Sequence, residues 1–140
     1  MNQIKIVIEA IPPSANNYMG NSHNFNTYRN DKKAWEMLIY AAARDKIPPK
    51  PFDKSTVEVV FYFSDAKRRD VDNYIKFLLD GIVKAKIIKD DSFSKVDKLI
   101  LSGSIDRVRP RTEIIVTEII ADLPIVERRK PKARFSNHKA

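Results

Sequence analysis

The sequence predicts an α+β domain in which two helices pack on a mixed β-sheet of about four strands. Several short segments alternate apolar and polar residues, which is typical of strands with one buried face. Two longer segments repeat apolar residues at three- and four-residue spacing, which is typical of amphipathic helices. The elements follow one another in the order β-α-β-α-β-β, and this order indicates helices packed on a sheet.

The first half of the chain begins with an alternating segment at residues 3–9, QIKIVIE, which predicts a half-buried strand. A Pro-Pro pair ends it. Residues 14–30 are rich in asparagine, which tolerates left-handed backbone, so we expect an irregular loop there. Asp31 can then cap a helix that runs to about Lys46, where prolines stop it.

The second half contains the strongest strand signal, the β-branched and aromatic run TVEVVFYF at residues 56–63. The segments expected after it are a polar loop at 64–69, a helix from Val71 or Asp72 to Lys86, an acidic turn at 87–95, and strands near 96–105 and 113–120. We assign residues 1–123 to one domain and residues 124–140 to a basic, flexible C-terminal tail, because the tail is rich in Lys and Arg and has little apolar content.

Composition narrows the classes of function. The chain has 140 residues, which suits one domain, and it contains no cysteine, so a metal site would need oxygen or histidine ligands. Residues 1–20 lack the pattern of a signal peptide, and no apolar run reaches the roughly 20 residues that span a bilayer. We therefore expect a cytoplasmic protein with no membrane partner.

The net charge of +8 favours a polyanionic partner, and nucleic acid is the commonest one in the cytoplasm. The alternative is a basic protein without such a partner.

Two aspartates just before the second predicted helix could carry chemistry. Asp70 and Asp72 are two residues apart, so in extended backbone their side chains point the same way. If the helix begins at Asp72, Lys76 lies one turn further along the same face. Convergent carboxylates suit Mg²⁺, which prefers oxygen ligands and can activate a phosphodiester, while a nearby lysine can neutralise charge on phosphate oxygens.

A second acidic pair, Asp90-Asp91, follows that helix. Neighbouring side chains usually point apart, so one of the two is expected to be a direct ligand. The helix runs away from Asp70 and Asp72, and the chain must return along the sheet to bring Asp91 close to them. A strand beside residues 56–63 would achieve this.

The same residues also have ordinary structural readings. Asp72 is a good helix N-cap, and Asp70 could stabilise the positive end of the helix dipole. Asp90 and Asp91 could form a simple turn, and the basic run at 67–69 could be a solvated loop. On this reading the chain is a non-catalytic nucleic-acid-binding module.

The motifs nevertheless resemble the RusA family of Holliday junction resolvases over roughly residues 4–120. The elements that carry the resemblance are Pro12-Pro13-Ser14 with Asn16-Asn17, then Arg69-Asp70-Val71-Asp72-Asn73-x-x-Lys76, then Asp80-Gly81, then Asp90-Asp91. Two features depart from the family pattern: the segment between Asn17 and Asp31 has few basic residues, and the tail after Leu123 does not align.

The resemblance implies a homodimeric, Mg²⁺-dependent endodeoxyribonuclease of bacterial or phage origin, associated with the nucleoid through DNA, with Mn²⁺ as a possible substitute ion. It would resolve four-way junctions by paired symmetric cuts in DNA recombination and repair. The implied metal ligands are Asp70, Asp72 and Asp91, the implied catalytic lysine is Lys76, and the implied DNA contacts are Lys67, Arg68, Arg69 and Asn73. A metal nuclease acting on other branched DNA remains an alternative.

Overall fold

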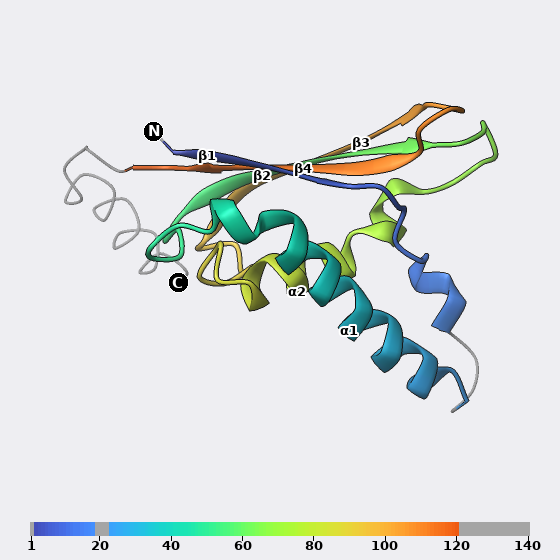
Figure 1. Cartoon of the computed structure of the whole chain (residues 1–140), viewed down its shortest axis with the longest axis horizontal. Helices are drawn as coiled ribbons and strands as arrows, with labels where there is room; N and C mark the ends of the chain where they lie inside the picture. Colours follow the sequence, from blue (N-terminus) through green and yellow to red (C-terminus); the bar gives the residue numbers. More distant parts are fainter. Residues whose placement is uncertain (1, 19–22, 121–140) are drawn as a thin grey trace, which may run out of the picture.

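The computed structural model describes residues 2–18 and 23–120. It confirms an α+β fold with a mixed four-stranded sheet and two α-helices (Figure 1). The strands are β1 (Gln3–Ile8), β2 (Ser55–Phe63), β3 (Val96–Ile105) and β4 (Arg111–Glu118). The helices are α1 (His23–Ala43) and α2 (Lys76–Lys84), with short 3₁₀ segments η1 (Ala15–Tyr18), η2 (Arg44–Lys46) and η3 (Val71–Tyr74). The predicted basic tail, residues 124–140, lies outside the described residues.

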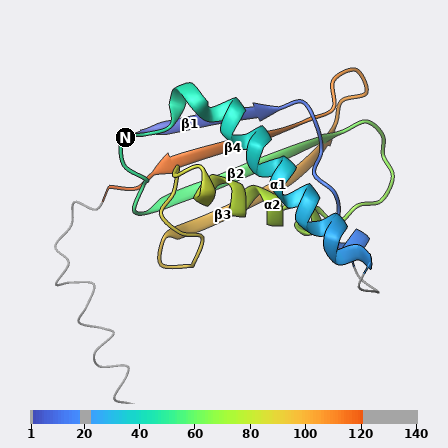
Figure 2. The same ribbon diagram turned by 60° about the horizontal axis from the view of Figure 1, so that its bottom comes forward.

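The sheet has the strand order β1-β4-β2-β3, and both α-helices cover the same face of it (Figure 2). Strand β4 is antiparallel to β1 and β2, whereas β3 is parallel to β2. Alternate residues of β2 are buried along its whole length, because this central strand presents one face to the helices. Among the described residues, no helix is long and apolar enough to cross a membrane.

The segment at residues 14–30 is more helical than the sequence predicts. Its asparagines favour a loop, but η1 occupies Ala15–Tyr18 and α1 already begins at His23. The expected cap Asp31 therefore lies inside α1, where it accepts a hydrogen bond from the Tyr18 hydroxyl (2.7 Å). Packing explains the extra turns, because the rings of Tyr18, Tyr28 and Phe77 lie together with centroids 5.2–5.9 Å apart.

The second predicted helix also differs from the expectation. The sequence predicts one helix from Val71 or Asp72 to Lys86, but the structure has the 3₁₀ segment η3, a break at Ile75, and then the shorter helix α2. Lys76 is consequently the first residue of α2 rather than a residue one turn inside a helix that starts at Asp72. Tertiary contacts favour the break, since Tyr74 packs against the rings of Phe61 and Phe63 on β2.

Close packing of the two α-helices depends on Gly81. It is buried in α2, and a Cβ atom added there would overlap with Cδ1 of Ile39, a fully buried residue of α1. We therefore expect Gly81→Val to lower the free energy of unfolding by about 1–3 kcal/mol through overpacking. Urea denaturation measures this change. Lys84→Val, at an exposed position of the same helix, is the control and should stay within about 0.5 kcal/mol of the wild type; an equal effect of both substitutions would refute the packing argument.

Candidate active site

The predicted site residues fall into two groups at different ends of the parallel strands. Asp70 and Asp72 follow the C-terminal end of β2, whereas Asp91 precedes the N-terminal end of β3. Because β2 and β3 are parallel, the C-terminal end of β2 and the N-terminal end of β3 lie at opposite ends of the strand pair. A strand does pair beside β2, as expected, but its parallel direction does not return Asp91 to Asp70 and Asp72. That part of the sequence-based expectation is wrong.

The position of η3 shows the extent of the separation. Val71 lies beside the far part of β3, where a Cβ atom on Gly103 would be 3.3 Å from Val71 Cγ1. Gly103 and the first residue of β3, Val96, are separated by roughly 20 Å along an extended strand. Asp70 and Asp72, which flank Val71, are thus held near one end of β3, while the turn carrying Asp91 enters at the other.

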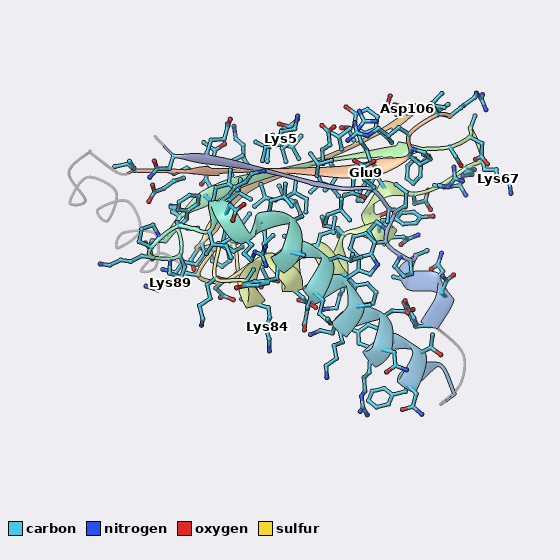
Figure 3. The ribbon with its side chains drawn as sticks, in the orientation of Figure 1. Lys5, Glu9, Lys67, Lys84, Lys89 and Asp106 are labelled. Carbon is cyan, nitrogen blue, oxygen red and sulfur yellow. The ribbon has the colours of Figure 1, made fainter. Side chains whose placement is uncertain are left out.

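The basic loop before Asp70 is held in shape by Asp65. The Asp65 carboxylate accepts a hydrogen bond from the Lys67 backbone N–H (3.1 Å) and pairs with Arg69 (2.8 Å), and these contacts lower the Asp65 pKa. The Arg69 guanidinium also lies over the Phe63 ring, 4.6 Å from its centroid. Arg69 therefore anchors the loop, whereas Lys67 and Arg68 are exposed and can contact a polyanion; Figure 3 shows Lys67 at the outer end of this loop.

Asp70 and Asp72 both face solvent at the start of η3. Asp70 has extended backbone and pairs with the exposed Arg68 (3.4 Å), and its carbonyl accepts a hydrogen bond from the Asn73 N–H (2.9 Å). Neither side chain caps α2, since that helix begins only at Lys76. The reading of Asp72 as an N-cap of a long helix is therefore wrong, and both carboxylates remain available to a ligand.

The second group lies beyond α2. The chain leaves this helix through Lys86, which has a positive φ of 66°, and buries Ile87 and Ile88 before reaching Asp90 and Asp91. Both aspartates are exposed and line a cavity of about 470 Å³ between α1 and α2. Its other lining residues are Tyr28, Lys32, Glu36, Lys76, Asp80, Val83 and Lys84.

Lys76 lies between the two groups. It lines the cavity that contains Asp90 and Asp91, and it also lines a smaller cavity of about 180 Å³ together with Asn73. Its ammonium group pairs with Asp80 one turn further along α2 (3.4 Å). The predicted lysine thus lines both cavities, as Tyr28 also does, and so lies between Asp90 and Asp91 on one side and Asn73 on the other.

Apart from Lys76, the charged residues that α1 and α2 contribute to this cavity have no role in the sequence-based prediction. Lys32 pairs with Glu36 (2.8 Å), and this hydrogen bond is the main cause of the raised pKa of Lys32. Asp80 is part of the Asp80-Gly81 motif, but its sequence context alone indicates no role in binding. The i, i+4 spacing of Lys32 with Glu36 and of Lys76 with Asp80 is the signal that could have found both pairs.

The donor types at these positions suit a hard cation, because carboxylate oxygens are the ligands that Mg²⁺ prefers. The arrangement within one chain is incomplete, however. In residues 2–18 and 23–120, no three His, Cys, Asp or Glu side chains are grouped so that they could hold one metal ion. Asp70, Asp72 and Asp91 as a ligand set therefore stay a prediction.

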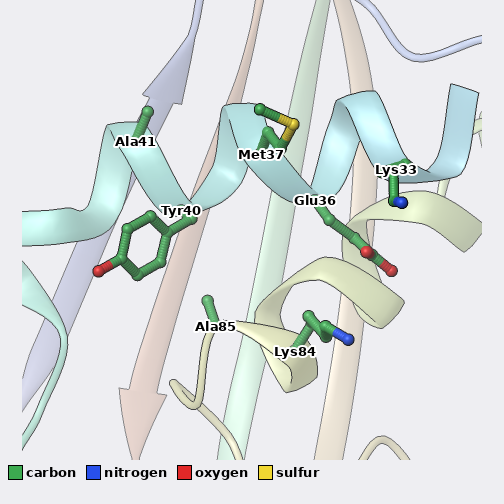
Figure 4. A pocket seen from close by; sticks show the side chains of 7 residues that line it. All are labelled: Lys33, Glu36, Met37, Tyr40, Ala41, Lys84 and Ala85. Carbon is green, nitrogen blue, oxygen red and sulfur yellow. The ribbon is translucent and has the colours of Figure 1, made fainter.

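A second, more apolar groove lies next to the cavity that contains Asp90 and Asp91 and shares Glu36 and Lys84 with it. It has a volume of about 730 Å³, and Met37 and Tyr40 of α1 line it opposite Lys84 and Ala85 (Figure 4). None of the predicted site residues lines this groove.

Comparison with protein-family models gives a match over most of the chain. A family model described as endodeoxyribonuclease RusA matches residues 10–117. No curated protein matches the chain. The matched segment contains both acidic groups, the basic loop at 67–69 and Lys76.

Proposed function

The chain belongs to the RusA family of endodeoxyribonucleases, and on this basis we propose that it resolves four-way DNA junctions by paired, Mg²⁺-dependent cuts. The family is one of Holliday junction-resolving endonucleases. The observation that carries the proposal is the extent of the match, which spans 10–117 and so includes every residue of the candidate site. We further propose a role in DNA recombination and repair and a bacterial or phage origin.

The proposed ligands of the ion are Asp70, Asp72 and Asp91, and Mn²⁺ is the expected substitute. When bound, a divalent ion of this kind supplies Lewis-acid polarisation of a phosphodiester. Lys76 brings a positive charge to the phosphate oxygens, where negative charge develops during cleavage. Lys76 pairs with Asp80, and both residues line the cavity that contains Asp90 and Asp91.

We propose that the active form is a dimer of two copies of the chain, for two reasons. A four-way junction has two-fold symmetry and needs two equivalent cuts, which a C2 dimer can make. In addition, within a single chain Asp91 lies near one end of β3, whereas Asp70 and Asp72 lie near the other end. A two-fold axis can place one end of a protomer beside the other end of its partner, so Asp91 of one copy would complete the ligand set of the other.

The DNA backbone is expected to follow the basic loop. Lys67 and Arg68 are exposed and can bind phosphates, whereas Arg69 holds the loop through Asp65 and Phe63. Asn73 lines the cavity next to Lys76 and is the proposed polar contact close to the cut. Contacts of this kind position a protein on DNA without reading its sequence.

The decisive experiment is cleavage of a synthetic four-way junction with Mg²⁺ and with a chelator. We expect paired, symmetric nicks with Mg²⁺, none with the chelator, and an intact linear duplex under both conditions. Linear duplex of the same sequence is the matched substrate control. Cleavage of flaps but not of junctions would favour the nuclease on other branched DNA, and binding without cleavage in both Mg²⁺ and Mn²⁺ would favour a non-catalytic binding module.

A further inference from the structure

The turn that carries Asp90 and Asp91 is held firmly at both ends. The Lys89 N–H donates to the Phe52 carbonyl (3.1 Å), and the Ser55 N–H donates to the Lys95 carbonyl (2.8 Å). A single carboxylate oxygen of Asp53 pairs with both Lys89 Nζ (3.5 Å) and Lys95 Nζ (3.0 Å). These contacts tie both sides of the turn, residues 89–95, to the segment before β2.

The tip of this turn presents a phenylalanine to solvent. Phe93 is 91% exposed, whereas Phe52, Phe61, Phe63 and Phe77 are buried. Inside the turn, the N–H groups of Lys95 and Val96 both donate to the Ser92 carbonyl (2.9 Å each), which fixes the backbone around Phe93. Because this turn is already restrained, a ligand that contacts Phe93 does not have to order it on binding. The same contact on a flexible segment would cost more conformational entropy and would therefore contribute less to affinity.

The proposed function indicates what the ring contacts. Phe93 is two residues from the predicted ligand Asp91, so their Cα atoms are at most about 7 Å apart, the span of two residues of extended chain. Successive nucleotides of one DNA strand are about 3.4 Å apart along the helix axis, so the ring can reach a base within a few nucleotides of the phosphate at Asp91. At the centre of a branched junction, bases are less constrained by stacking than in a duplex, and every base has a face on which an aromatic ring can stack.

We propose that Phe93 stacks on a nucleobase at the junction branch point, close to the phosphate that is cut. This inference rests on the proposed function and adds to it a source of selectivity for branched over linear DNA. Phosphate contacts through Lys67 and Arg68 are available on any duplex, whereas a stacking contact requires a base that has left its own stack. Phe93 is thus a DNA-binding residue that favours branched DNA over linear duplex.

The test compares junction binding and cleavage by the wild type, Phe93→Ala and Phe93→Tyr. Val108→Ala is the matched control, because Val108 is 93% exposed and lies in the turn between β3 and β4, at the opposite end of β3. We expect Phe93→Ala to weaken junction binding by about 5- to 100-fold, with Phe93→Tyr close to the wild type and duplex binding by all variants nearly unchanged. 2-Aminopurine placed at the branch point should change fluorescence with the wild type and with Phe93→Tyr, but not with Phe93→Ala.

The outcomes separate this inference from the proposed function. If the wild type binds and cuts junctions and Phe93→Ala does so equally well, the stacking role is wrong and the proposed function stands. If Phe93→Ala alters the sedimentation of the free protein, the ring contacts another protein chain and the inference is again overturned. If the wild type neither binds nor cuts junctions, both proposals fail.

Discussion

Asp70→Asn is expected to lose junction cleavage by about a thousandfold while it still binds the junction. A lost metal ligand removes several kcal/mol of transition-state stabilisation, and each 1.36 kcal/mol corresponds to a tenfold change in rate. Binding should be kept or strengthened, because the substitution deletes a negative charge near phosphate. The fold should not suffer, since Asp70 is exposed and its ion pair with Arg68 joins two exposed side chains.

Single-turnover cleavage and equilibrium binding of the same labelled junction measure the two effects separately. Asp45→Asn is the matched control, because Asp45 is an exposed aspartate in η2, outside the candidate site. It should cleave at the wild-type rate. Normal cleavage by Asp70→Asn would remove Asp70 from the ligand set, and loss of binding together with cleavage would indicate a structural role instead.

Mixing Asp70→Asn with Asp91→Asn should restore nicking that neither variant shows alone. If each ion is held by Asp70 and Asp72 of one copy and by Asp91 of the partner, a mixed dimer has one site with both substitutions and one intact site. With random exchange of subunits, half of the dimers are mixed, so about a quarter of the wild-type number of sites should work. The products should be single nicks rather than paired cuts, because each mixed dimer has one working site.

A second mixture makes this test specific. Asp70→Asn and Asp72→Asn change carboxylates at the same end of the sheet, so their mixture should stay inactive however the sites are built. Restored nicking in the first mixture but not in the second would support a site shared by two copies. No restoration in the first mixture, after subunit exchange has been shown, would mean that each ion is held within one chain.

The fold class and most of the strands follow from the amino-acid sequence alone. Period-two alternation identifies β1 and β2 within a residue or two, and the run at 96–105 coincides with β3. This succeeds because strand pattern and turn residues are local properties of the chain. The motif around Asp70 likewise predicts the RusA family from sequence alone, and the family match over 10–117 confirms that assignment.

Helix boundaries are less predictable, because packing between distant residues sets them. The asparagine-rich segment forms η1 and the start of α1, and there Tyr18 and Tyr28 pack with Phe77 from α2. The break at Ile75 depends on the packing of Tyr74 against β2. Local preferences of asparagine or aspartate carry no information about such partners.

The relation between the two acidic groups depends on tertiary structure alone. The order of Asp70, Asp72 and Asp91 along the chain does not reveal the direction in which β3 pairs with β2. In a parallel pair, the C-terminal end of β2 and the N-terminal end of β3 lie at opposite ends of the strands. The connection through α2 must therefore run back along the whole length of the strands. The direction of that one strand pair separates the carboxylates within a chain.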